Sequence, residues 1–343
     1  MRKFFLAAVC LLASLSRAPA PEAFVSVFYN ATLGTWVYER EDATLVTAPS
    51  ATCQLQEALD YAYPKGLSVA YYGHGQCDIA GTGIVVPAQF GNSFYGYGMH
   101  LSFTNTGQNG LFFDTQRYGK WSCQGCSLYY SGQGFAAGAQ PAHAPDGKAC
   151  VDEDTGGWSI DYDFDMGLIQ ANGGDVAALW LVDVTQCNGV NQLRSSGFTN
   201  NTVRFTGLEC ANNAEYGMRM FTPTNHFQVA GENRYEFNNV EGCKIAEFSI
   251  GDSGGAFDVG LGTNIYIGNV AHTASAIGTF GIITDASMDQ FILTSLNTYA
   301  PGGWQGAVFW GPSAQNNVIT TRQAIGWPAL QVGNQSNNKL VDQ

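Results

Sequence analysis

The C-terminal half of the chain repeats one short pattern: Gly217-Met-Arg-Met-Phe221 returns as Gly242-Cys-Lys-Ile245, and Gly281-Ile-Ile-Thr284 returns as Gly306-Ala-Val-Phe309. In both pairs the second glycine follows the first by 25 residues. A second set of apolar runs opens on Asn or Asp, at Asn225, Asn264, Asp289 and Asn317. Both residue types accept the left-handed turn conformation and bond to nearby backbone. Stacked coils of about 20–25 residues with Gly or Asn corners therefore predict a parallel β-helix.

Short β-type runs separated by Gly and Asn extend this pattern from residue 67 to residue 322. Before them, four apolar residues at helical spacing (Leu55, Ala58, Leu59 and Ala62) predict a short helix over residues 52–63, capped by Thr52 and ended at Lys65-Gly66. The predicted fold is all-β, a single-stranded right-handed parallel β-helix over residues 67–322 with this N-terminal capping helix. Residues 21–66 form the lead-in and capping helix, with β-type runs at 24–29 and 35–38, and residues 323–343 a C-terminal tail.

Residues 1–20 predict a secretory signal peptide. Arg2 and Lys3 precede an apolar stretch, Phe4–Leu15, and small residues follow it. The apolar stretch is too short to span a bilayer, and no later segment is long and apolar enough to do so. The sequence therefore predicts a secreted protein, extracellular or periplasmic, with no membrane span.

Removal of the signal peptide leaves eight cysteines: Cys53, Cys77, Cys123, Cys126, Cys150, Cys187, Cys210 and Cys243. An even number in an exported chain predicts disulfides. Cys53 and Cys77 bracket one helix–strand unit and are the simplest pair to predict. Cys123-x-x-Cys126 is compatible with a redox pair or half a zinc site, but no second C-x-x-C and no histidine cluster accompany it, which favours a structural bridge.

The chain carries a net charge of −13, and loss of Arg2, Lys3 and Arg17 with the signal peptide takes this to −16. Nucleic acids and anionic membranes require positive surface, so the charge argues against both as partners. Hydrophobic residues make up 45% of the chain, enough for a packed core, which excludes a disordered protein.

The N-terminal stretch resembles the cap and first coils of the pectate-lyase-like superfamily. The matching pieces are Leu55–Ala62, Leu67–Gly75, Ile84–Pro87 and Tyr95–Gly98, within residues 50–105. The chain departs from the pattern at Ser50-Ala51-Thr52, where an acidic pair is usual, and at Tyr72–Gly75, where a Pro-Gly turn is usual. The resemblance implies the fold alone, because the superfamily includes polysaccharide lyases, glycoside hydrolases, esterases and non-catalytic adhesins.

Two short motifs copy catalytic segments of other families. Gly251-Asp-Ser-Gly-Gly255 matches the nucleophile segment of chymotrypsin-like proteases, but no histidine of the mature chain lies in the matching context. Gly73-His74-Gly75 matches an element of polygalacturonases whose aspartate motifs are missing here. We interpret the first as a loop inserted into one coil and the second as a turn, and we expect Ser253 to be dispensable.

Asp161, Asp163 and Asp165 alternate along a β-type run, so a strand would place all three on one face. Crowded carboxylates favour a bound cation, for which Ca²⁺ is the candidate, or raised pKa values. Paired carboxylates also perform glycoside hydrolysis. A solvated outer face is the alternative interpretation. The predicted catalytic groove joins these residues to Asp183 and Arg219 on neighbouring coils, where the resemblance implies a basic or charge-neutralising role for the arginine.

The resulting hypothesis is a secreted β-helix protein that binds a polysaccharide or cell-surface glycan and cleaves it as a lyase or glycoside hydrolase. The alternative is a non-catalytic surface or adhesion protein. The 15 Lys and Arg residues are few for a pectate-like polyanion. Three N-x-Ser/Thr acceptor sequences for N-glycosylation begin at Asn30, Asn200 and Asn334.

Overall fold

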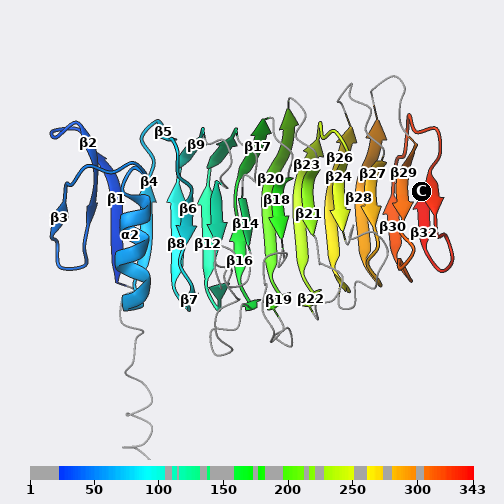
Figure 1. The fold of residues 1–343 in the computed structure, drawn as a ribbon, viewed down its shortest axis with the longest axis horizontal. Helices are drawn as coiled ribbons and strands as arrows, with labels where there is room; N and C mark the ends of the chain where they lie inside the picture. Colours follow the sequence, from blue (N-terminus) through cyan, green and yellow to red (C-terminus); the bar gives the residue numbers. More distant parts are fainter. Residues whose placement is uncertain are drawn as a thin grey trace, which may run out of the picture.

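The computed structural model describes residues 23–104, 110–113, 116–131, 137–139, 158–172, 177–181, 196–211, 216–220, 228–250, 261–272, 280–298 and 305–343. Within these ranges the protein is almost entirely β, and its strands stack side by side along one long axis (Figure 1). The predicted signal peptide and Asp183 lie outside the described residues, as does Ser253. No helix in the described part is long and apolar enough to cross a bilayer.

The described strands form three sheets, here called A, B and C. Sheet B contains β6 (Ile84–Val86), β10 (Leu111–Phe113), β14 (Ala137–Ala139), β18 (Ala177–Leu181), β21 (Tyr216–Met220), β24 (Ala246–Ile250), β27 (Phe280–Thr284), β29 (Gly306–Trp310) and β31 (Gln331–Gly333). Sheet C contains β7 (Gln89–Phe90), β11 (Gln116–Arg117), β15 (Trp158–Ile160), β19 (Ser196–Thr199), β22 (Gln228–Gly231) and β25 (Leu261–Gly262).

Sheet A contains the remaining strands. They are β1 (Phe24–Asn30), β2 (Thr35–Glu39), β3 (Leu45–Val46), β4 (Ser68–Tyr72), β5 (Gln76–Ile79), β8 (Ser93–Tyr97), β9 (His100–Phe103), β12 (Lys120–Gln124), β13 (Ser127–Tyr130), β16 (Asp163–Asp165), β17 (Leu168–Asn172), β20 (Thr202–Ala211), β23 (Arg234–Glu241), β26 (Ile265–His272), β28 (Gln290–Thr298), β30 (Val318–Thr321) and β32 (Lys339–Asp342). From β6 the chain visits sheets B, C and A in that order, and after β26 its described strands alternate between sheets B and A; we call each passage that returns to sheet A a coil.

Each strand pairs in parallel with its counterpart one coil later, as β6 does with β10, β7 with β11 and β8 with β12. Among the described strands, the antiparallel pairs are β1–β2 and β2–β3 at the N-terminal end. The prediction of an all-β protein with parallel stacked strands is therefore confirmed. The stacking also continues beyond residue 322, because β31 pairs with β29 and β32 with β30, so the predicted tail contributes strands of its own.

The glycine pairs indicated a realistic coil length but the wrong register. Tyr216 pairs with Ala246 and Phe280 with Gly306, so these two coils take 30 and 26 residues instead of 25. Gly242 lies in a turn with φ of 82°, where a Cβ atom would lie 2.6 Å from the carbonyl oxygen of Cys210. The close backbone approach requires this glycine, and the strand period does not.

The corner between sheets C and A carries the true repeat. From β20 onwards, one residue with positive φ, between 55° and 63°, precedes each such corner: Asn200, Glu232, Thr263, Met288, Asn316 and Asn337. The next residue is a buried Asn or Asp whose side-chain oxygen accepts a backbone N–H from the coil before it, and these are Asn201, Asn233, Asn264, Asp289, Asn317 and Asn338. We call this column the asparagine ladder. Three of its rungs, at 264, 289 and 317, were predicted as corners, whereas the predicted corner at Asn225 lies outside the described residues.

The interior consists of apolar side chains stacked from coil to coil. Phe94 lies on Trp121 with ring centroids 3.7 Å apart, and Tyr266 lies between Tyr235 and Phe291 at 4.7 and 4.2 Å. Parallel register puts equivalent positions directly above one another, which aligns these rings. Stacked aromatic pairs add stabilisation beyond their buried area.

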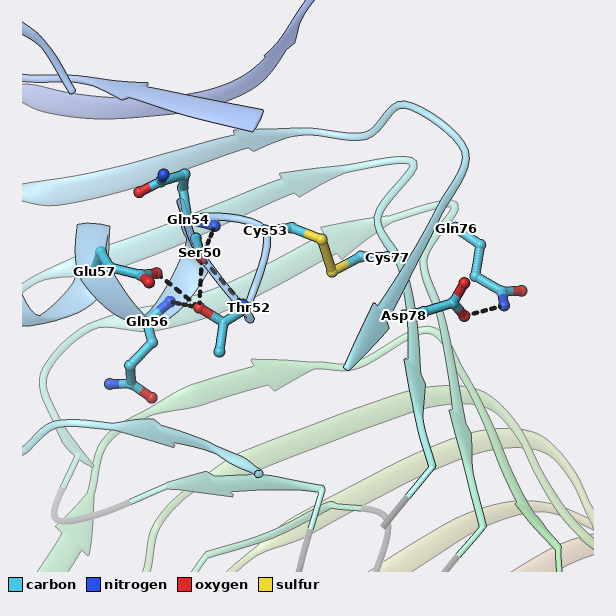
Figure 2. The surroundings of a disulfide bond; sticks show 9 residues. All are labelled: Ser50, Thr52, Cys53, Gln54, Gln56, Glu57, Gln76, Cys77 and Asp78. Atoms are coloured by element: carbon cyan, nitrogen blue, oxygen red, sulfur yellow. Dashed lines mark hydrogen bonds between the residues drawn. A yellow bond between two sulfur atoms is a disulfide. The ribbon is translucent and has the colours of Figure 1, made fainter. Parts of the chain in front are cut away.

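Near the N-terminal end, α2 (Leu55–Ala62) packs against β1, β4 and β6 and is followed by a 3₁₀ turn (Tyr63–Lys65), which ends at Gly66 in the left-handed conformation. The helix is shorter than predicted and starts at Leu55. The N-cap position is Gln54, but the Thr52 hydroxyl still accepts the N–H of Gln56 in the first turn, at 3.4 Å, and donates to Glu57. The Ser50 hydroxyl accepts the N–H groups of Thr52 and Gln54 (Figure 2).

Three disulfides are present among the described cysteines. Cys53–Cys77 ties the cap to β5, as predicted (Figure 2), and Cys210–Cys243 links two coils. Cys123 and Cys126 are bonded to each other and buried, which agrees with a structural bridge. The remaining two cysteines of the mature chain, Cys150 and Cys187, fall outside the described residues.

Candidate functional site

The outward face of sheet A, from β4 to β32, carries charged and aromatic side chains close together, and we call it wall A. Residues alternate between core and wall along β12, β13 and β16. On β16, Phe164 is buried while Asp163 and Asp165 point outward and are half-buried. The prediction that alternate aspartates share a face is confirmed for these two residues.

A charged network crosses three coils of wall A. One nitrogen of Arg204 on β20 lies 2.5 Å from an Asp163 oxygen, and another lies 2.9 Å from Glu236 on β23. Arg234 lies 2.5 Å from the other Glu236 oxygen. The hydrogen bond from Arg234, followed by that from Arg204, holds the pKa of Glu236 below its usual value. Such exposed pairs contribute only about 0–1 kcal/mol each, so the network mainly fixes the side chains in place.

The carboxyl group of Asp165 has a raised pKa. Burial raises the pKa of its carboxyl group, the negative charge of Asp163 adds to that rise, and a bond from the Gly167 N–H partly opposes it. A carboxyl with a raised pKa retains its proton at higher pH, and it can then donate a hydrogen bond or a proton.

Tyrosines occupy the wall next to this network. Tyr72 on β4 and Tyr97 on β8 are 48% and 43% exposed, and their rings stack at 5.4 Å with an interplanar angle of 15°. We call them the tyrosine shelf. Tyr95 lies two residues before Tyr97 on the same strand, with the ammonium of Lys120 at 4.6 Å from its ring centroid. Because β12 lies between β8 and β16 in sheet A, the tyrosine shelf and the charged network lie within a few coils of each other.

The predicted groove is only partly assembled. Asp161 lies in the exposed corner before β16, with φ of 50°, and accepts a hydrogen bond from the Asn200 amide. Arg219 is on β21 of sheet B, paired with Trp180 and Ser249, and so does not share a sheet with Asp163 and Asp165. Between Asp165 and Arg219 the chain completes one further coil, through β18, β19 and β20, before it enters sheet B again at β21. The structure therefore corrects the prediction for Arg219, which does not lie on the face that carries Asp163 and Asp165, whereas Asp183 falls outside the described residues.

Arg204 is the basic residue that meets the aspartates, and sequence reasoning missed it. The signal was present, since Thr202-Val-Arg-Phe205 and Arg234-Tyr-Glu-Phe237 both alternate polar and apolar residues. The parallel pairing of β16 with β20 and of β20 with β23 brings Asp165, Arg204 and Glu236 into one row.

Metal and nucleophile chemistry find limited support in the described part. No group of three or more His, Cys, Asp or Glu side chains there is arranged to hold a metal ion, and one Asp163 oxygen is already bound to Arg204. Ser127 and His100 form a hydrogen bond of 2.7 Å. On the neighbouring strand at the other side of His100, the residue in register is Gln76, which is not a carboxylate. A hydrolytic triad requires a carboxylate to orient the imidazole, so this pair is better described as a surface contact.

Comparisons of the chain with protein-family models, curated proteins and solved structures found no match.

Proposed function

We propose that this chain is a right-handed parallel β-helix of the pectate-lyase-like type, exported with its disulfides, and that wall A binds a glycan. The stacked parallel coils, the helix over the N-terminal end and the three disulfides support the architectural part. The positively charged, apolar N-terminal segment supports export. The function rests on the chemistry of wall A.

The observation that carries the proposal is the exposed tyrosine shelf beside a fixed charged network on one wall. Sugar rings present apolar C–H faces, which stack on aromatic rings, and hydroxyl groups, which need well-placed donors and acceptors. Tyr72 and Tyr97 supply the first kind of contact. Arg204 and Glu236 supply the second, and their geometry is fixed before the ligand arrives.

The ligand we propose is a neutral glycan. Arg204 is balanced by Asp163 and Glu236, so the network offers no excess of positive charge to a polyanion. The mature chain is strongly acidic as well. A polyuronate would meet repulsion over most of the surface unless cations neutralised it.

Cleavage of the bound glycan is the second candidate, and Asp165 favours it. Glycoside hydrolysis needs one carboxyl group with a raised pKa as general acid and a second carboxylate near it. Asp165 and Asp163 lie two residues apart on one strand, about 7 Å along the backbone. Both carboxyl groups therefore face the same side of wall A.

Binding is tested with a panel of neutral and uronic-acid polysaccharides, using Tyr97→Ala and, as matched control, Tyr118→Ala. Tyr118 is 62% exposed and lies outside wall A, in the turn between β11 and β12. We expect Tyr97→Ala to bind a neutral glycan about tenfold more weakly, which is the loss expected when an aromatic contact of about 1.4 kcal/mol is removed. The control Tyr118→Ala should bind normally. Equal affinity of both variants and wild type would remove the proposal.

Cleavage is tested on the polysaccharide that binds, by product analysis with wild type and Asp165→Asn. Release of shorter chains by wild type but not by the variant, at unchanged affinity, supports hydrolysis. Binding with no products from wild type identifies an adhesion protein instead.

A further inference from the structure

The three N-glycosylation acceptor sequences of the chain occupy different places in the fold, and the side-chain amide nitrogen of each asparagine has different partners. That nitrogen is the atom to which a glycan is attached. In the folded protein it must therefore be free of competing hydrogen bonds, and the Ser or Thr two residues later must be accessible.

Asn30 ends β1 at the tip of the β1–β2 hairpin, and residues 31–34 that follow it are all exposed. Its side-chain oxygen accepts the backbone N–H groups of Thr32 and Leu33, at 3.0 and 3.1 Å. This Asx turn holds the oxygen against the backbone and leaves both amide hydrogens without an acceptor in the described part. Accepting two hydrogen bonds also draws electron density from the amide nitrogen and makes its N–H groups more acidic.

The other two asparagines use the same nitrogen to hold the coils together. The Asn200 amide donates to Asp161 one coil earlier. The Asn334 amide donates to the carbonyl oxygens of Pro312 and Ala314, both at 3.3 Å. Moreover, the residue after Asn200 is a buried rung of the asparagine ladder, so Asn200 cannot move without disturbing the core.

We propose that Asn30 is the N-glycosylation site of the folded protein and that Asn200 and Asn334 are protected from modification. The donor is a lipid-linked oligosaccharide pyrophosphate. The Asn30 amide nitrogen forms a bond to the anomeric carbon of the first sugar, the bond from that carbon to the pyrophosphate oxygen breaks, and the nitrogen loses one proton. The hydroxyl of Thr32, in the exposed tip, takes part in recognition of the acceptor.

The test uses the full-length mature protein, produced without glycans and with its disulfides formed. It is incubated with a single-subunit oligosaccharyltransferase and a lipid-linked oligosaccharide, and the occupancy of each site is measured by peptide mass spectrometry. We expect Asn30 to be modified and the other two sites to react about tenfold less, the factor that one to two net hydrogen bonds confer. The reduced and unfolded chain should be modified at all three sites.

Two variants separate geometry from sequence. Thr32→Ala should abolish modification at Asn30 without changing the fold, and Asp161→Ala should release the Asn200 amide and raise its occupancy in the folded protein. The proposal fails if folded Asn30 remains unmodified, whether or not the unfolded chain reacts there. It also fails if Asn200 or Asn334 reacts as fast as Asn30 in the folded wild type.

Discussion

Asp289 is the one carboxyl group among the described rungs of the asparagine ladder, and its replacement by Asn should stabilise the protein at neutral and alkaline pH. Its side chain is 1% exposed. One oxygen accepts the backbone and side-chain N–H groups of Asn264, and the other faces the Tyr266 hydroxyl at 3.4 Å. Burial dominates these bonds and raises the pKa of Asp289 to about 7.

The magnitude follows from linkage. The ordinary pKa of this carboxyl is 3.8 and its pKa in the folded protein is about 7, a rise of roughly three units. One unit corresponds to about 1.4 kcal/mol, so ionisation of Asp289 costs the folded state roughly 4 kcal/mol. Because the pKa is raised on folding, the contribution of the protonated Asp289 carboxyl to folding stability is fully present below about pH 4. It is lost as the pH rises through about 7. Tyr235 and Tyr266, which face this carboxyl, remain neutral throughout that window.

Asparagine at 289 removes this titration and places an amide where it can donate to the Asn317 side-chain oxygen, which accepts the Asp289 backbone N–H, just as the Asn317 amide donates to Asn338. Urea unfolding followed by circular dichroism at pH 4 to 8.5 measures the effect. We expect Asp289→Asn to exceed wild type in unfolding free energy by up to roughly 4 kcal/mol at pH 8.5, with the gap closing towards pH 4. Asp342→Asn at the exposed end of β32 is the matched control. A wild-type-to-variant difference that does not change between pH 4 and 8.5 would refute the reasoning.

Three further outcomes are expected. Replacing both Cys210 and Cys243 by Ser should lower the unfolding free energy by about 3–4 kcal/mol, because the bond closes a chain segment of 33 residues, and calorimetry would show an unchanged melting temperature if this is wrong. Asp163→Asn should lower the pKa of Asp165 by removing a neighbouring negative charge, which carboxyl carbon NMR titration measures directly. Gly96→Val should destabilise the protein, because even its Cβ would lie 2.8 Å from a disulfide sulfur; a melting curve like that of wild type would contradict this.

The sequence predicted the stacked parallel strands because coil corners have a strong local signal. Asn264, Asp289 and Asn317 stand at the starts of apolar runs, where a buried side chain has to satisfy the backbone of the neighbouring coil. The glycines at 217 and 242 led to the wrong register. They are needed where backbones approach closely or turn, and these places do not recur at the strand period.

The candidate site was harder to predict, because its residues come from coils of different length. Successive ladder rungs from Asn201 to Asn338 are separated by 32, 31, 25, 28 and 21 residues. Period-two alternation was enough to place Asp163 and Asp165 together. No constant offset, however, leads from Asp165 to Arg204 and Glu236, and Arg219 was assigned to the wrong sheet for the same reason.

The asparagine ladder also separates the parts of the chain whose length varies from the corner residues that stay constant. From β20 onwards, each described coil enters sheet A through a left-handed residue and a buried Asn or Asp, while the spacing between successive rungs ranges from 21 to 32 residues. Insertions and deletions between corners thus leave the alignment of neighbouring coils intact. A designer who wishes to display a foreign peptide on this scaffold can lengthen a coil between rungs, and needs only to keep the two corner residues unchanged.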